Sequence, residues 1–147
     1  MKFKIAFVLA FTLFATNLLS GQGENLPVSK QNSTVFNREV LFADGVVYLN
    51  EKEKDGILWL NNTSFKNGTI EVDLKGRNVQ GKSFVGFVFH AQDEETFDAI
   101  YFRPFNFKSK ERGQNSVQYI SMPQYGWETL RETFPRKYEK AVNPIPS

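Results

Sequence analysis

Short apolar runs alternate with polar turns along this chain, a pattern typical of a β-sheet protein. The two clearest runs are SFVGFVFHA at 83–91 and FDAIYFRPFNF at 97–107, separated by the polar connection QDEET. Both runs are short and rich in Phe, Val, Ile and Tyr, which favours strands over helices. A connection of about five residues suits a hairpin. The sequence therefore predicts a central β-hairpin.

Alternation along the two strands sorts their side chains onto two faces. One face is purely apolar and comprises Val85, Phe87, Phe89, Ile100 and Phe102. The other face is mixed and comprises Gly86, Val88, His90, Tyr101, Arg103 and Phe105. We expect the apolar face to lie against the core and the mixed face to form the functional surface.

The remaining pattern predicts more short strands and one late helix. GTIEVDLK at 68–75 alternates most cleanly, with Ile70, Val72 and Leu74 predicted to point inward. Further β-rich runs lie at 46–50, 57–60 and 117–121, whereas VFNREVLF at 35–42 fits either a strand or a helical turn. WETLRETF at 127–134 has helical spacing and is followed by proline. Many short strands with one short helix indicate an all-β sandwich or jelly roll.

The first 21 residues have the layout of a secretory signal peptide. Lys2 and Lys4 precede an apolar run of 15 residues at 5–19, which small and polar residues follow. That run is shorter than the roughly 20 residues of a membrane span, so we expect no stable membrane span. The protein is expected to be secreted or periplasmic. Residues 22–41 are predicted to be an irregular lead-in, and 42–147 the folded domain.

The amino-acid composition excludes several kinds of partner and metal site. Removal of the signal peptide takes away two lysines and no acid, so the net charge falls from +2 to 0, and we expect no nucleic-acid partner. The chain has no Cys and one His, which excludes thiolate and multi-histidine metal sites. We predict no metal and no cofactor; Asp93, Glu94 and Glu95 are candidates for calcium, but three consecutive acids are more typical of a solvated loop. Export without disulfides suits a bacterial protein.

The succession GILWLNNTSFKNGTIEVDLKG, FVGFVFHAQDEETFDAIYFRPFNF and VQYISMPQYGWETLRETFPRKYE resembles bacterial concanavalin A-like lectin/glucanase domains. It is most similar to exported laminin-G-like and 3-keto-disaccharide hydrolase-like modules, which are related to family 16 glycoside hydrolases. The resemblance covers 42–146 and implies a two-sheet jelly roll whose concave face holds a saccharide. Such domains normally continue with further strands. We therefore expect either a sandwich truncated at its C-terminus or one completed by another protein segment.

A saccharide site needs flat aromatic rings and planar polar groups. The predicted ligand-binding residues are His90, Tyr101, Arg103, Asn106, Gln118 and Trp127. A structural role is the alternative: Arg103 would form an ion pair with Glu71 or Asp98. Tyr101 and Phe105 would then pack under the late helix.

The sequence supports catalysis less strongly than it supports saccharide binding. Retaining glucanases of the resembled fold have a Glu-x-Asp-x-Glu strand motif, of which this chain matches Glu71 and Asp73 but has Lys75 in the third place. Outward acids are also ordinary on an amphipathic strand. Three hypotheses follow: a carbohydrate-binding module without complete catalytic equipment, a glycoside hydrolase using Glu71 or Asp73 with help from His90 or Arg103, and an interaction domain completed by another chain.

Overall fold

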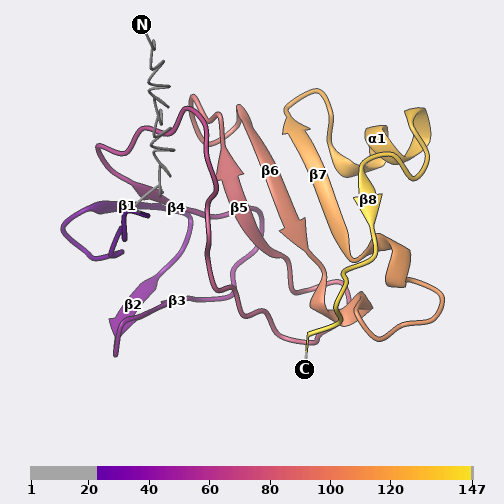
Figure 1. The fold of residues 1–147 in the computed structure, drawn as a ribbon, viewed down its shortest axis with the longest axis horizontal. Helices are drawn as coiled ribbons and strands as arrows, with labels where there is room; N and C mark the ends of the chain where they lie inside the picture. The colour runs from indigo at the N-terminus through magenta and orange to yellow at the C-terminus, as the bar shows by residue number, and fades with distance from the viewer. Residues whose placement is uncertain (1–22, 147) are drawn as a thin grey trace, which may run out of the picture.

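The computed structural model describes residues 23–146; the predicted signal peptide at 1–21 lies outside them. The described chain consists mainly of short strands in antiparallel sheets, with one α-helix, α1 (Trp127–Thr133) (Figure 1). The predicted all-β class is therefore confirmed. Within residues 23–146, no helix combines the length and the apolar character that crossing a membrane requires.

Two small ribbons form the N-terminal part. Strand β1 (Ser33–Phe36) pairs with β4 (Ile57–Leu60), and β2 (Val40–Ala43) pairs with β3 (Val46–Leu49). The β2–β3 turn is Asp44-Gly45, and both residues have positive φ, as a tight hairpin turn requires. The lead-in predicted at 22–41 was expected to be irregular, but it contains β1 and the start of β2. The partner of β1 lies far along the chain, so local pattern did not indicate the pairing.

The main sheet is an antiparallel meander in the order β5-β6-β7-β8. Its strands are β5 (Val85–Phe89), β6 (Phe97–Phe102), β7 (Val117–Met122) and β8 (Glu139–Lys140). The predicted central hairpin is present as β5 and β6, with Gly86 opposite Tyr101. A Cβ atom on Gly86 would lie 2.6 Å from the Tyr101 Cα and closer still to the Ile100 carbonyl oxygen, so only glycine allows this close approach.

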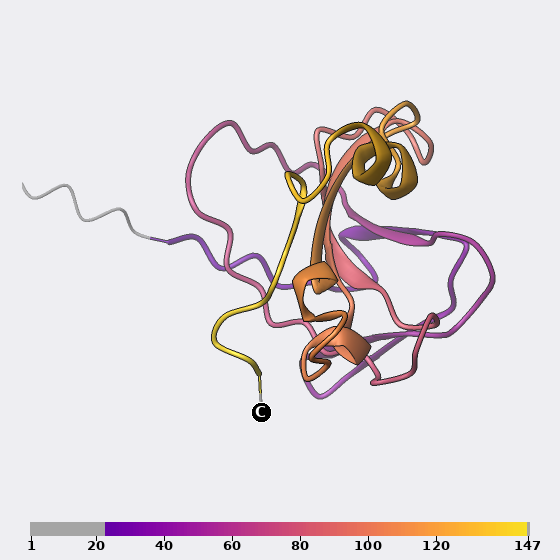
Figure 2. The ribbon, with the colours of Figure 1, turned by 90° about the vertical axis from the view of Figure 1, so that its right-hand side faces the viewer.

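The core lies against the mixed face of this sheet. Ile57, Phe97 and Ala99 are buried, and the partly buried side chains packed on them are Trp59, Val88, Ile120 and Met122. Helix α1 covers the other end of the same face and buries Leu130. Figure 2 shows α1 and the β1–β4 ribbon on the same side of the sheet.

The assignment of the two faces was therefore wrong. The purely apolar face, which was expected to be buried, is open, and Ile100 at its centre is 40% exposed. Alternation determines which side chains share a face. It does not determine which face the distant elements β4 and α1 will cover.

The predicted strand at 68–75 is not a strand in this structure. Its supposedly inward side chains Ile70, Val72 and Leu74 are 42–55% exposed. The segment runs beside β5 in Figure 1 but stands away from the sheet in Figure 2. A strand needs a hydrogen-bonded partner, and β5 pairs only with β6 among the described strands.

Candidate functional site

Five of the six predicted ligand residues gather at the α1 end of the mixed face. These are Tyr101, Arg103, Asn106, Gln118 and Trp127. Their centre is Arg103, which follows β6 and is only 6% exposed. The sixth residue, His90, directly follows β5 and bonds to Asp98, whose side chain belongs to the opposite face.

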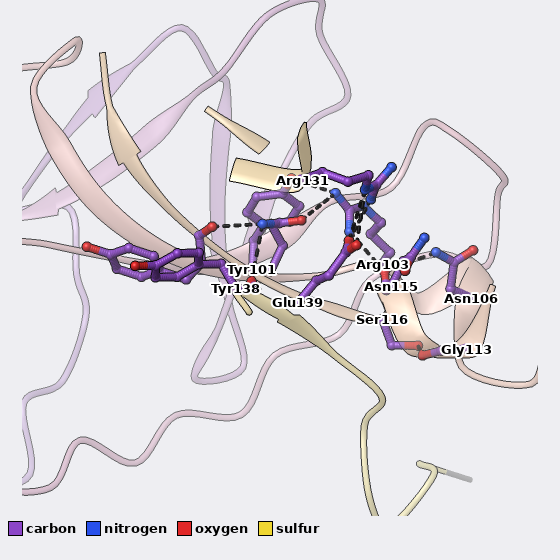
Figure 3. Close-up of polar contacts among 11 residues, drawn as sticks. Tyr101, Arg103, Asn106, Gly113, Asn115, Ser116, Arg131, Tyr138 and Glu139 are labelled. Atoms are coloured by element: carbon purple, nitrogen blue, oxygen red, sulfur yellow. Dashed lines mark hydrogen bonds and ion pairs between the residues drawn. The ribbon is translucent and has the colours of Figure 1, made fainter. Parts of the chain in front are cut away.

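Arg103 donates hydrogen bonds to three neutral acceptors (Figure 3). Its Nη1 donates to the Asn115 carbonyl oxygen at 2.9 Å, and its Nη2 donates to the Tyr101 hydroxyl at 2.9 Å and to Gln118 Oε1 at 3.3 Å. The guanidinium carbon also lies 5.0 Å from the centre of the Tyr101 ring and 5.8 Å from that of Trp127. Burial lowers the pKa of Arg103 and raises the pKa of Tyr101. The ion pair considered for Arg103 with Glu71 or Asp98 does not form.

The polar contacts continue into two 3-10 helices, η1 (Pro104–Asn106) and η2 (Gly113–Asn115). Asn106 Nδ2 donates to the Asn115 carbonyl at 3.1 Å, and Ser116 Oγ donates to the Gly113 carbonyl at 2.6 Å. Every buried side-chain nitrogen and oxygen among the described residues has a hydrogen-bond partner. This Arg103 network is therefore saturated from within, which is what a structural element requires.

A second guanidinium attaches α1 to the last strand. Arg131 binds Glu139 through Nε at 3.1 Å and Nη2 at 2.6 Å, and the Glu139 side chain is 8% exposed. The Arg131 guanidinium also lies 4.8 Å from the Trp127 ring centre. Trp127 is therefore in contact with two guanidinium groups while remaining 40% exposed.

The open face of the sheet carries a continuous set of aromatic rings, which we call the aromatic row. Its members in spatial order are Phe87, Phe89, Tyr119, Tyr138 and Phe134. Successive ring centres are 6.3, 6.5, 5.7 and 5.7 Å apart. Ile100 lies between Phe87 and Tyr119 in the register. The row joins residues from distant parts of the chain, so the sequence shows its members but not their adjacency.

Polar groups flank the aromatic row at its β5 end. His90 Nδ1 lies 2.8 Å from Asp98 Oδ2, and the His90 ring meets Phe89 edge-on at 4.9 Å. Hydrogen bonds from Ser121 and His90 hold the pKa of Asp98 below its ordinary value. The His90 side chain is 75% exposed, so its other nitrogen is open to a ligand. Aromatic rings and hydrogen-bonding groups therefore meet on one open surface.

The catalytic candidates lie elsewhere. Glu71 and Asp73 are exposed on the 68–75 segment, outside every described strand. One cavity of about 300 Å³ is lined by Trp59 and the loop residues 91–94. Another, of about 320 Å³, is lined by residues of β2 and β3 and their neighbours. Neither cavity includes Glu71 or Asp73.

The calcium candidates form part of a loop closure. Asp93 Oδ1 accepts hydrogen bonds from the backbone N–H groups of Glu95 at 2.9 Å and Thr96 at 2.6 Å. These bonds lower the pKa of Asp93. Among residues 23–146 there is no group of three or more His, Cys, Asp and Glu side chains that could hold a metal ion.

Comparison with protein-family models, with curated proteins and with solved structures found no match for this chain. The resemblance to concanavalin A-like domains therefore stays a hypothesis from the sequence.

Proposed function

We propose that this domain is an exported carbohydrate-binding module that holds a saccharide chain on the aromatic row. The observation that carries the proposal is the open sheet face, on which the partly exposed Phe87, Phe89, Tyr119 and Tyr138 form one row. Ile100 and Phe134 on the same face are 40% and 37% exposed. A soluble protein rarely leaves a contiguous aromatic surface uncovered unless the surface binds something.

The chemistry of the row suits a sugar. An aromatic ring offers a flat apolar surface for the C–H face of a pyranose, and the tyrosine hydroxyls add hydrogen-bonding groups. The row crosses neighbouring strands, so four strands give a length of about 14 Å, which favours an oligosaccharide over a single sugar. His90, Asp98 and Ser121 lie at one end, where they would bond to sugar hydroxyls. This arrangement also agrees with the sheet-face saccharide that the family resemblance implies.

The Arg103 network supports this surface from behind. Gln118 lies beside Tyr119 in β7, and its Nε2 donates to the carbonyl oxygens of Tyr119 at 2.9 Å and Tyr138 at 3.2 Å. Those two residues are the centre of the aromatic row. We infer that the buried polar residues hold the row rigid before the ligand arrives, which lowers the entropic cost of binding.

The test is calorimetric titration of the mature chain with a panel of oligosaccharides, using Tyr119→Ala as the variant. We expect the variant to bind about fivefold more weakly, since one stacked ring contributes on the order of 1 kcal/mol. Tyr48→Ala is the matched control, because Tyr48 is 53% exposed on β3 and lies outside the row. The proposal fails if no saccharide binds, or if the two variants bind as tightly as the unchanged chain.

An interaction domain completed by another chain is the second candidate. It is favoured by the apolar side chains Ile70, Val72 and Leu74, which the structure leaves exposed on an unpaired extended segment. A mature chain that shows no cooperative thermal transition alone would favour this function over the first. The glycoside hydrolase alternative has no comparable support, because Glu71 and Asp73 lie on the same exposed segment.

A further inference from the structure

One end of the aromatic row carries a positive charge. Lys137 Nζ lies 5.3 Å from the ring centre of Phe134 and 5.4 Å from that of Tyr138. Two aromatic rings at once attract the ammonium group, and Lys137 is exposed to solvent. Lys140 follows Tyr138 by two residues, so alternation puts both on the row face, and Lys140 is exposed. The β8 end of the row is therefore basic.

The charges along the chain are also unevenly distributed, with an excess of basic residues in its C-terminal part. Residues 103–146 contain eight Lys and Arg against four Asp and Glu, whereas residues 23–102 contain eight against twelve. Within the four described strands of the main sheet, Asp98 is the one acid that the register puts on the row face, and it is paired with His90 at the other end. The nearby acid Glu139 alternates to the opposite face, where it pairs with Arg131. Nothing in these strands therefore neutralises Lys137 and Lys140.

We propose that the saccharide bound by the aromatic row is anionic, carrying a uronate carboxylate or a sulfate ester that Lys137 binds beside Tyr138. This inference rests on the proposed function and names its ligand class. A neutral sugar would gain stacking on the rings but nothing from the ammonium group. An anionic sugar gains both, because its negative charge would lie beside Lys137, which forms no ion pair among residues 23–146.

The test compares an anionic oligosaccharide with its neutral ester and with a saccharide that carries a different anion. The mature chain is titrated with an oligogalacturonate, with the methyl ester of the same oligosaccharide, and with a sulfated galactan. We expect at least one of the two anionic ligands to bind more tightly than the ester, with an advantage that falls as salt rises. Lys137→Ala is expected to weaken the anionic ligand about fivefold and leave the ester unchanged. Lys52→Ala is the control, because Lys52 is exposed and lies outside the main sheet.

The possible results distinguish a failure of this inference from a failure of the proposed function on which it rests. If the ester binds as tightly as both anionic ligands, or if Lys137→Ala has no effect, the inference is overturned while saccharide binding stands. If the anionic ligands bind but Tyr119→Ala binds them equally well, the attraction is purely electrostatic and both proposals are wrong. A preference for oligogalacturonate alone identifies the carboxylate as the anion, and a preference for the sulfated galactan alone identifies the sulfate ester.

Discussion

At the scale of single residues, the predicted ligand side chains divide into two environments. Arg103, Asn106 and Gln118 are 6%, 3% and 1% exposed, so their polar atoms bond to protein groups. His90 is exposed beside the aromatic row and has a positive φ of 51°, which is uncommon for a residue with a side chain. Residue type alone identified groups that form hydrogen bonds. Burial decided which of them remain open to a ligand.

Asp98 makes the stability of the protein depend on pH. Its pKa is lowered in the folded state by Ser121 and then by His90, so the folded state binds a proton less readily than the unfolded chain. This contribution is therefore fully present above the ordinary aspartate pKa of 3.8 and is lost as pH falls through the lower folded value. In urea unfolding across this range, we expect the unchanged chain to lose its advantage over Asp98→Asn as pH falls. An advantage that is constant with pH would show that this pairing is absent in solution.

At the scale of elements, strand pairing separates the correct predictions from the wrong ones. The β5–β6 hairpin and the helix at Trp127–Thr133 depend on contacts close in sequence, and both were predicted. The segment 68–75 has the alternation of a strand, but among the described strands it has no partner. Alternation is a necessary condition for a half-buried strand and does not supply the neighbouring strand that makes one.

Two matched valine substitutions test whether the segment 68–75 is packed against the rest of the protein. Val72 is 55% exposed, so we expect Val72→Thr to change the free energy of unfolding by less than about 0.5 kcal/mol. Val88 packs on the core, so Val88→Thr is expected to cost about 1–2 kcal/mol because it buries a hydroxyl. Chemical denaturation of the purified mature chain measures both free-energy changes. Equal costs for the two variants would mean that the segment is packed in solution, as the sequence predicted.

At the scale of the whole molecule, the Arg103 network joins parts that are distant in the chain. It connects β6, β7, η2 and α1 through Tyr101, Gln118, Asn115 and Trp127. The network and the core cluster occupy the same face of the main sheet. That face is therefore covered along its length, and the aromatic row lies on the face that stays open.

Removing Arg103 should destabilise the whole domain. We expect Arg103→Ala to lower the free energy of unfolding by about 2–4 kcal/mol, because the Tyr101 hydroxyl and Gln118 Oε1 lose this donor in a buried site. Arg77→Ala is the matched control and should change it by less than about 0.5 kcal/mol, since Arg77 pairs with Glu51 on an exposed surface. If Arg103→Ala remains as stable as Arg77→Ala but binds saccharide more weakly, Arg103 belongs to a ligand site and its assignment as structural is wrong.

Local sequence pattern was enough to predict the all-β class, the central hairpin, the late helix and the composition of the two sheet faces. These follow from side-chain volume, alternation and helical spacing, which act between residues close in the chain. Local pattern did not predict that the mixed face is buried and the apolar face is open. Ile57 and Trp59 from β4 and Trp127 from α1 cover the mixed face, and that choice depends on packing between segments that no local pattern records.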